Sequence, residues 1–143
     1  MNQRNDRKLF REFEHTGDLG IELEAPTRLE LFANAALALA HLMVAAQGIS
    51  PRESRVIETS AETDEDLMHD MLAAALNVFL ADGFIWCETR AQELPGGVAV
   101  TLRGEQFDPR RHQLLTEIKA VTYHELRVER RRGLWRARIV FDV

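Results

Sequence analysis

The chain has 143 residues, of which 45% are hydrophobic and 29% are charged, and its formal net charge at pH 7 is −5. We expect one compact domain over residues 1–143. The negative balance argues against broad, phosphate-driven binding of nucleic acid, which needs clustered Lys and Arg. The single cysteine, Cys87, excludes an intramolecular disulfide framework and a cysteine-built zinc site.

The chain contains no apolar run that approaches the ~20 residues of a membrane span. The opening residues, MNQRNDRKLF, lack the apolar stretch of a signal peptide. We therefore expect a soluble, cytoplasmic protein without a membrane partner. Cys87 suits a reducing compartment, and in the strand-like run GFIWCETR we interpret it as a small buried hydrophobe in preference to a catalytic thiol.

Two short extended segments, KLFREFEH and IELEA, flank the link TGDLG near the start of the chain. The glycines of this link favour a turn between two strands. Two helices then follow. Thr27 and Glu30 have the spacing of a capping box, and apolar residues recur at helical spacing from Leu31 until Gly48.

The second helix begins at Thr63 and should end at Asp82-Gly83. Three acids, residues 64–66, follow the capping threonine and face the positive end of the helix dipole. We favour this structural interpretation of the run TDED over a metal cluster.

The rest of the chain favours strands, because β-branched and aromatic residues concentrate in it. The predicted strands are residues 55–60, 84–90, 98–103, 116–128 and 134–141. Short turns between them imply antiparallel neighbours. The expected fold is α+β: a mostly antiparallel sheet with two helices packed on one face.

Two polar turns leave alternatives open. The basic run Glu129–Gly133 is favoured as a solvated hairpin turn, and the alternative is a contact with RNA or with an acidic patch of a partner. In GEQFDPRRH, the charges of Glu105, Asp108 and Arg110 surround a turn at Asp-Pro. A structural role is favoured there over recognition by a partner.

The last strand, LWRARIVFDV, alternates between an apolar face and a more polar face that carries Asp142. If the last strand docks beside the first turn, Asp18, Asp142 and the terminal carboxylate of Val143 come together. A hard divalent cation would offset their repulsion. Spacing alone favours the alternative, in which Asp18 caps a turn and Asp142 is solvated.

Several blocks of the sequence resemble the archease family, in the family's order: FEHTGDLG, LELFANAALAL, ETDEDLMHDMLAAALNVFL, GEQFDPRRH, TEIKAVTYH and the terminal FDV. The resemblance implies an accessory protein of tRNA splicing. Archeases activate the GTP-dependent ligase that joins RNA 3′-phosphate and 5′-hydroxyl ends. They promote guanylylation and multiple turnover of the ligase and broaden its nucleotide use. Contact with RNA would be indirect, through the ligase.

The resemblance also implies a divalent ion, calcium, bound by Asp18, Asp142 and Val143. Gly17 stands where the family motif leads us to expect Ala, and it removes no ligand. We expect His15 to orient the turn by hydrogen bonding, because a hard cation prefers oxygen ligands.

We expect no catalytic residues. Strand alternation separates Lys119 and Tyr123 from His124, so the segment TEIKAVTYH cannot supply one compact catalytic set, and Glu117 has no assigned role. The sequence contains no phosphate-binding Gly loop and no nucleophile–base pattern. An activator is therefore favoured, and the alternative is a stand-alone metal-dependent enzyme that acts on RNA ends or nucleotides.

Overall fold

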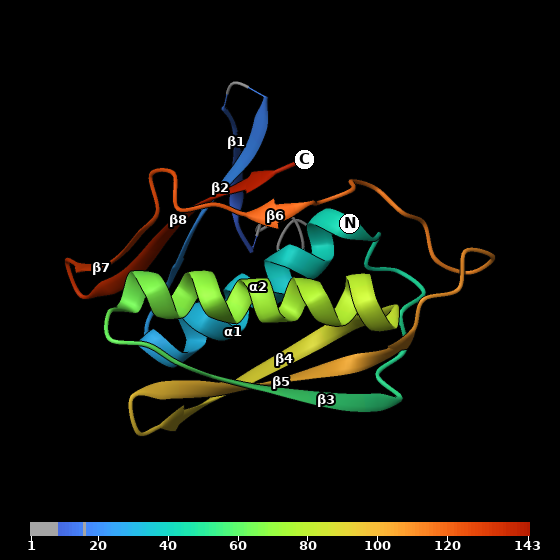
Figure 1. Ribbon diagram of the computed structural model, residues 1–143, viewed down its shortest axis with the longest axis horizontal. Coiled ribbons are helices and arrows are strands. Elements are labelled where there is room, and N and C mark those ends of the chain that lie inside the picture. Colours follow the sequence, from blue (N-terminus) through green and yellow to red (C-terminus); the bar gives the residue numbers. More distant parts are fainter. Residues whose placement is uncertain (1–8, 16) are drawn as a thin grey trace.

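Two helices and two antiparallel sheets make up the described part of the chain. The computed structural model describes residues 9–15 and 17–143, in which the helices lie between a five-stranded and a three-stranded sheet (Figure 1). The elements are β1 (Arg11–His15), β2 (Asp18–Ala25), α1 (Arg28–Met43), β3 (Glu53–Ser60), α2 (Asp64–Asp82), β4 (Phe84–Leu94), β5 (Gly97–Gln106), β6 (Ala120–Val121), β7 (Arg127–Arg131) and β8 (Leu134–Asp142). The predicted α+β class, with two helices and antiparallel strands, is confirmed.

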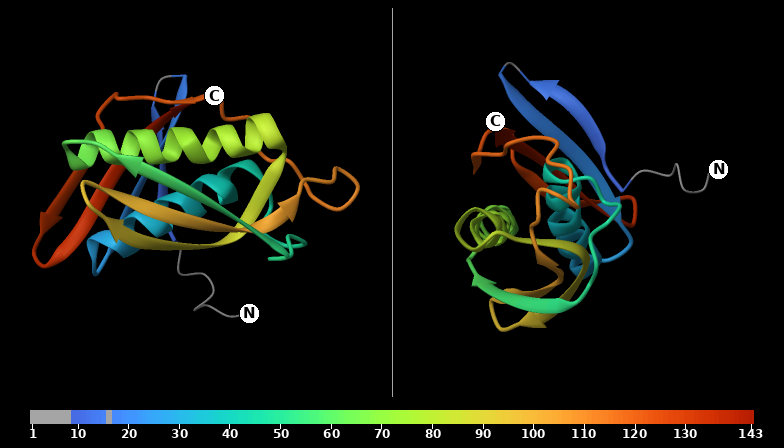
Figure 2. Two further views of the ribbon diagram at one scale, coloured as in Figure 1. Left: turned by 60° about the horizontal axis from the view of Figure 1, so that its bottom comes forward. Right: turned by 90° about the vertical axis from the view of Figure 1, so that its right-hand side faces the viewer.

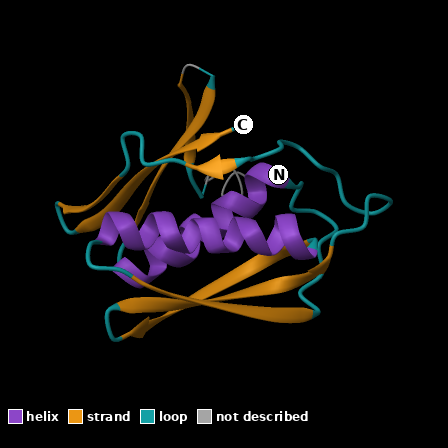
Figure 3. Ribbon diagram, viewed as in Figure 1, coloured by secondary structure: helices purple, strands orange, loops and turns teal. Residues whose placement is uncertain are grey.

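The strands divide between two sheets instead of forming one. The larger sheet has the order β1-β2-β8-β6, with β7 also paired to β8, and the smaller has the order β3-β5-β4. Helix α1 contacts β4 and β5 on one side and β2 and β8 on the other, and α2 contacts β3, β4, β6 and β7 (Figures 2 and 3). No helix among the described residues is long and apolar enough to cross a membrane.

The composition of α1 explains why one sheet cannot cover it. Ten of the sixteen residues of α1 are buried, including alanines on several faces of the helix. A helix that is apolar all round needs cover on more than one side. Two side chains of β4, in the smaller sheet, hydrogen-bond to the backbone of α1: the Trp86 indole donates to the Ala36 carbonyl at 2.9 Å, and the Thr89 hydroxyl donates to the Ala33 carbonyl at 2.6 Å.

The predicted helix starts are confirmed, and one predicted helix end is wrong. Thr27 and Thr63 each accept a hydrogen bond from a backbone N–H three residues later, at 3.1 Å. Gly83 ends α2 in the left-handed conformation, with φ of +69°. Helix α1 ends at Met43 and does not reach Gly48, because Val44 turns extended and pairs with Leu114 in an isolated bridge.

The predicted strand over residues 116–128 is also wrong. Only β6 and the first two residues of β7 are extended strand there. The backbone N–H and hydroxyl of Thr122 both donate to the Val140 carbonyl, and the Thr122 hydroxyl accepts from the His124 N–H at 3.1 Å. Glu125 then takes a φ of +54°, which no regular strand allows. The side chains of Ile118, Val121 and Val128 are nevertheless buried, although no continuous strand connects these residues.

Candidate functional site

The first turn and the last strand meet at one end of the larger sheet. Asp18, the first residue of β2, is the register partner of Asp142, the last residue of β8. Directly opposite residues of an antiparallel pair share one face of the sheet, with Cβ atoms about 4.5–5.5 Å apart. The structure therefore brings together two of the three residues expected at a metal site.

The end of β8 is paired on both of its edges. Ala120 of β6 is the other register partner of Asp142, and the Lys119 N–H donates to the Asp142 carbonyl at 2.8 Å. Val143 follows Asp142 and is 38% exposed. This pairing fixes the backbone of a terminal strand that would otherwise fray.

The donors at this end of the sheet fit a hard cation. Like charges placed directly opposite each other destabilise a strand pair, and a divalent ion bound by carboxylate oxygens would offset that cost. Among residues 9–15 and 17–143, no three His, Cys, Asp or Glu side chains are grouped to hold a metal ion. The carboxylates of Asp18 and Asp142 are the oxygen donors that the strand register brings to this end of the sheet. Such a set suits calcium or magnesium and not zinc.

The turn next to Asp18 explains the departure at Gly17. Gly17 has a φ of +74°, in the left-handed region that favours glycine over alanine. His15 is the backbone register partner of Asp18. Its side chain, to which we assign the orientation of this turn, lies outside the described residues, as does Thr16.

The polar residues that follow β6 do not form a compact set. The Tyr123 ring stacks on the His69 ring of α2, with centroids 3.8 Å apart and an interplanar angle of 12°. His124 lies instead beside Glu125, with a nitrogen–oxygen distance of 3.6 Å. Tyr123 and His124 therefore contact different neighbours, although not through the strand alternation that was predicted, because residues 122–126 are not a strand; Glu117 and Lys119 are exposed.

A buried carboxylate lies at the end of β5. Glu105 is 4% exposed, and its carboxylate accepts from the Arg111 guanidinium at 2.7 Å and from the Ser50 N–H at 2.8 Å. The His112 Nδ1 atom accepts from the Asp108 N–H, so its Nε2 atom carries a proton and donates to Glu105 at 2.9 Å. These donors outweigh burial and lower the pKa of Glu105 to about 2.

This cluster supports the structural interpretation of GEQFDPRRH. A partner cannot reach Glu105, because its side chain is buried and its carboxylate is hydrogen-bonded to Arg111, Ser50 and His112. The sequence-based interpretation named Glu105, Asp108 and Arg110 but missed Arg111 and His112. Their signal was the placement of a cation and an imidazole on the far side of the Asp-Pro turn, where they can fold back toward Glu105.

Comparison with known proteins identifies the family. The profile of the Archease protein family (MTH1598/TM1083) matches residues 10–143. The archease of Methanopyrus kandleri is 36% identical over 141 residues, which cover 94% of this chain and 99% of that protein. The archease of Pyrococcus furiosus is 32% identical over 136 residues, which cover 92% and 96% of the two chains.

Solved structures agree with the sequence matches. The solution structure of Methanobacterium thermoautotrophicum protein 1598 superposes with a TM-score of 0.76 at 28% identity, covering 94% of this chain and 98% of that one. The crystal structure of a Thermotoga maritima archease, described as a possible chaperone, gives a TM-score of 0.66 at 27% identity and covers 93% and 96%. The chain belongs to the archease family.

Proposed function

We propose that this protein is an accessory factor that activates a GTP-dependent RNA-splicing ligase, the enzyme that joins RNA 3′-phosphate and 5′-hydroxyl ends. It acts by promoting guanylylation of the ligase, and so supports multiple turnover and a broader use of nucleotides. The observation that carries this proposal is the family match across residues 10–143, which includes the blocks at both ends of the chain. The protein works in the cytoplasm and catalyses no joining itself.

The proposal includes a divalent ion, calcium, at the end of the larger sheet. The carboxylates of Asp18 and Asp142 would hold it, together with an oxygen of Val143. Support comes from the register of β2 and β8, which places the two aspartates opposite each other. A bound divalent ion supplies positive charge that can attract phosphate or carboxylate oxygens of a partner.

The chain's own contribution is to position these acids at an accessible end of the molecule. Strands β2 and β6 pair with the two edges of β8, so the backbone that carries the Asp142 carboxylate is fixed. Asp142 and Val143 are both exposed. A partner can therefore reach this end without rearrangement of the sheets.

A guanylylation assay tests the proposal. Purified ligase and labelled GTP, without RNA, should yield more guanylylated ligase when the protein is present. Asp142→Asn should reduce that stimulation, because it removes an anionic oxygen from the proposed site. Glu58→Gln, which removes a carboxylate from an exposed position of β3, should retain it.

Two outcomes would contradict the proposal. The wild-type protein could leave guanylylation unchanged. Alternatively, incubation with GTP and a 3′-phosphate RNA could give joined or altered RNA ends without the ligase, which would mark the protein as a stand-alone enzyme.

A further inference from the structure

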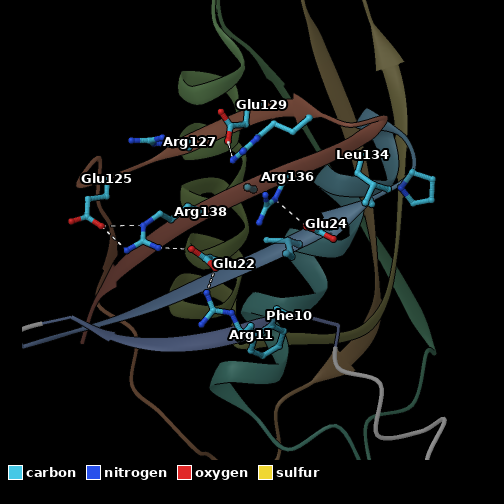
Figure 4. Close-up of a pocket in the computed structure, with 15 residues that line it drawn as sticks. Phe10, Arg11, Glu22, Glu24, Glu125, Arg127, Glu129, Leu134, Arg136 and Arg138 are labelled. Carbon is cyan, nitrogen blue, oxygen red and sulfur yellow. Dashed lines mark hydrogen bonds and ion pairs between the residues drawn. The ribbon is translucent and has the colours of Figure 1, made fainter.

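The outer face of the larger sheet carries a groove that the proposed function does not use. Strands β1, β2, β7 and β8 contribute its lining, and most of the lining side chains are charged (Figure 4). The acids in the lining are Glu22, Glu24, Glu125 and Glu129, and the bases are Arg11, Arg127, Arg131, Arg136 and Arg138.

On the β2 side of the groove, arginines and glutamates neutralise one another. Glu22 lies between Arg11 and Arg138 and forms an ion pair with each. Burial opposes the charged form of Glu22, but the hydrogen bonds from these two arginines prevail, so its pKa is lowered. Arg138 also bonds Glu125 at 2.7 Å, and Arg136 pairs with Glu24 at 3.0 Å. This side of the groove therefore offers little net charge to a ligand.

The β7 side is different, because its cations are in excess. Residues 127–133 contain four arginines and one acid, in a chain whose net charge is −5. Arg127 is directly opposite Arg138, an arrangement of like charges that destabilises a strand pair. Arg127, Arg130 and Arg132 are exposed and form no ion pair within the described part of the chain. These three arginines, which we call the β7 rim, can accept an external anion.

The hairpin turn adds an independent observation. Arg132 and Gly133 connect β7 to β8 with φ values of +54° and +80°. A two-residue turn with both central residues at positive φ favours Asn or Asp followed by Gly. An arginine in this conformation is unfavourable, and backbone strain of this kind concentrates at functional positions. Here the strained residue places a cation at the tip of the β7 rim.

We propose that the β7 rim binds the phosphate backbone of RNA. This inference rests on the proposed function, because it assigns to the protein a direct contact with the substrate of its ligase partner. Arginine guanidinium groups bind phosphate through paired hydrogen bonds. β7 lies at an edge of the larger sheet, and its side chains alternate between the two faces: Arg127 lies on the groove side of this edge, Arg130 on the other side and Arg132 at the tip, so an extended phosphate backbone that runs along the edge can reach all three. A stable protein partner would need about 800 Å² of surface on each side.

RNA binding can be measured without the ligase. A fluorescently labelled single-stranded oligouridylate should bind the full chain in an anisotropy titration at low salt. Arg127→Ser should weaken binding, whereas Arg90→Ser, an exposed arginine in β4 of the smaller sheet, should not. In the triple variant Arg127→Ser, Arg130→Ser, Arg132→Asn, the slope of log K against log salt should decrease by about 2 in magnitude, since each single-strand phosphate contact contributes about 0.7.

Four results would overturn the inference. The wild type could fail to bind the oligouridylate, or Arg90→Ser could weaken binding as much as Arg127→Ser. A polyglutamate peptide could bind the β7 rim as tightly as RNA, which would assign the rim to an acidic protein. The triple variant should also stimulate RNA-free guanylylation like wild type; a loss there would identify the rim as a contact with the ligase. Failure of the wild type to stimulate guanylylation would defeat the proposed function and leave the RNA titration unaffected.

Discussion

At the scale of single residues, Glu105 shows how a buried charge can hold two loops in place. Its carboxylate joins the end of β5 to Ser50 in one loop and to Arg111 and His112 in another. An isolated buried carboxylate is costly, but this one is surrounded by hydrogen-bond donors. Its low pKa means that the folded protein holds the ionised form more strongly than the unfolded chain does.

Glu105→Gln should therefore reduce stability in a pH-dependent way. The pKa of Glu105 falls from an ordinary 4.5 to about 2 on folding, so its contribution is complete above pH 4.5 and is lost as pH falls toward 2. At pH 7 the variant should lose about 3 kcal/mol of unfolding free energy relative to wild type. Urea unfolding across this pH range measures the difference, which should narrow with acidification. Glu58→Gln is the exposed control, and a pH-independent gap for Glu105→Gln would contradict the assignment.

At the scale of elements, the β7–β8 turn contains an arginine, Arg132, in a left-handed conformation that lowers stability. Asn tolerates the left-handed conformation better than Arg, so Arg132→Asn should stabilise the protein by about 0.5–1 kcal/mol. Thermal or urea unfolding measures this gain. Arg130→Asn is the matched control, because Arg130 is an extended residue of β7 and Asn is a poor strand former. Equal effects of the two substitutions would show that lower charge repulsion, and not turn conformation, is responsible.

The sequence predicted element boundaries well where contacts between residues close in sequence determine them. The capping threonines, Thr27 and Thr63, and the left-handed Gly83 define helix ends through contacts within a few residues. The C-terminus of α1 is set instead by a pairing between Val44 and Leu114, which are distant in sequence. Segment 116–128 has strand-like residues, but side-chain and backbone hydrogen bonds at Thr122 bend it.

The candidate site could be predicted only in part. Asp18 lies in the predicted turn and Asp142 directly follows the last predicted strand, and spacing alone favoured separate roles for them; the pairing of β2 with β8 brings the two aspartates together, whereas the set with Val143 came from the resemblance. Periodicity gives no information on which strands share a sheet, and the division into two sheets could not be predicted. The partners of Glu105 depend on how two loops fold back onto β5, which also lies beyond local pattern.

At the scale of the whole molecule, the larger sheet joins the first two strands, β1 and β2, to the last strand, β8. β8 pairs with β2 along one edge and with β6 and β7 along the other, so the last strand is an interior strand of the sheet. Its inward residues Ala137, Ile139 and Phe141 are buried in the core beside the helices. Detachment of the C-terminus would therefore expose core surface and separate Asp142 from Asp18.

An ion bound between Asp18 and Asp142 should stabilise the pairing of β8 with β2. Added calcium should raise the melting temperature of metal-stripped wild type, because the site exists only when β2 and β8 are paired; at about 100 times Kd the gain is about 2.7 kcal/mol. Asp18→Asn, Asp142→Asn and deletion of Val143 should each reduce this increment and the affinity measured by calorimetry. Glu58→Gln should keep both. Equal calcium affinity in all these proteins would rule out the shared site. Variants that lose calcium affinity but still stimulate guanylylation fully would restrict the ion to a structural role, because stabilisation by calcium would then be separable from activation of the ligase.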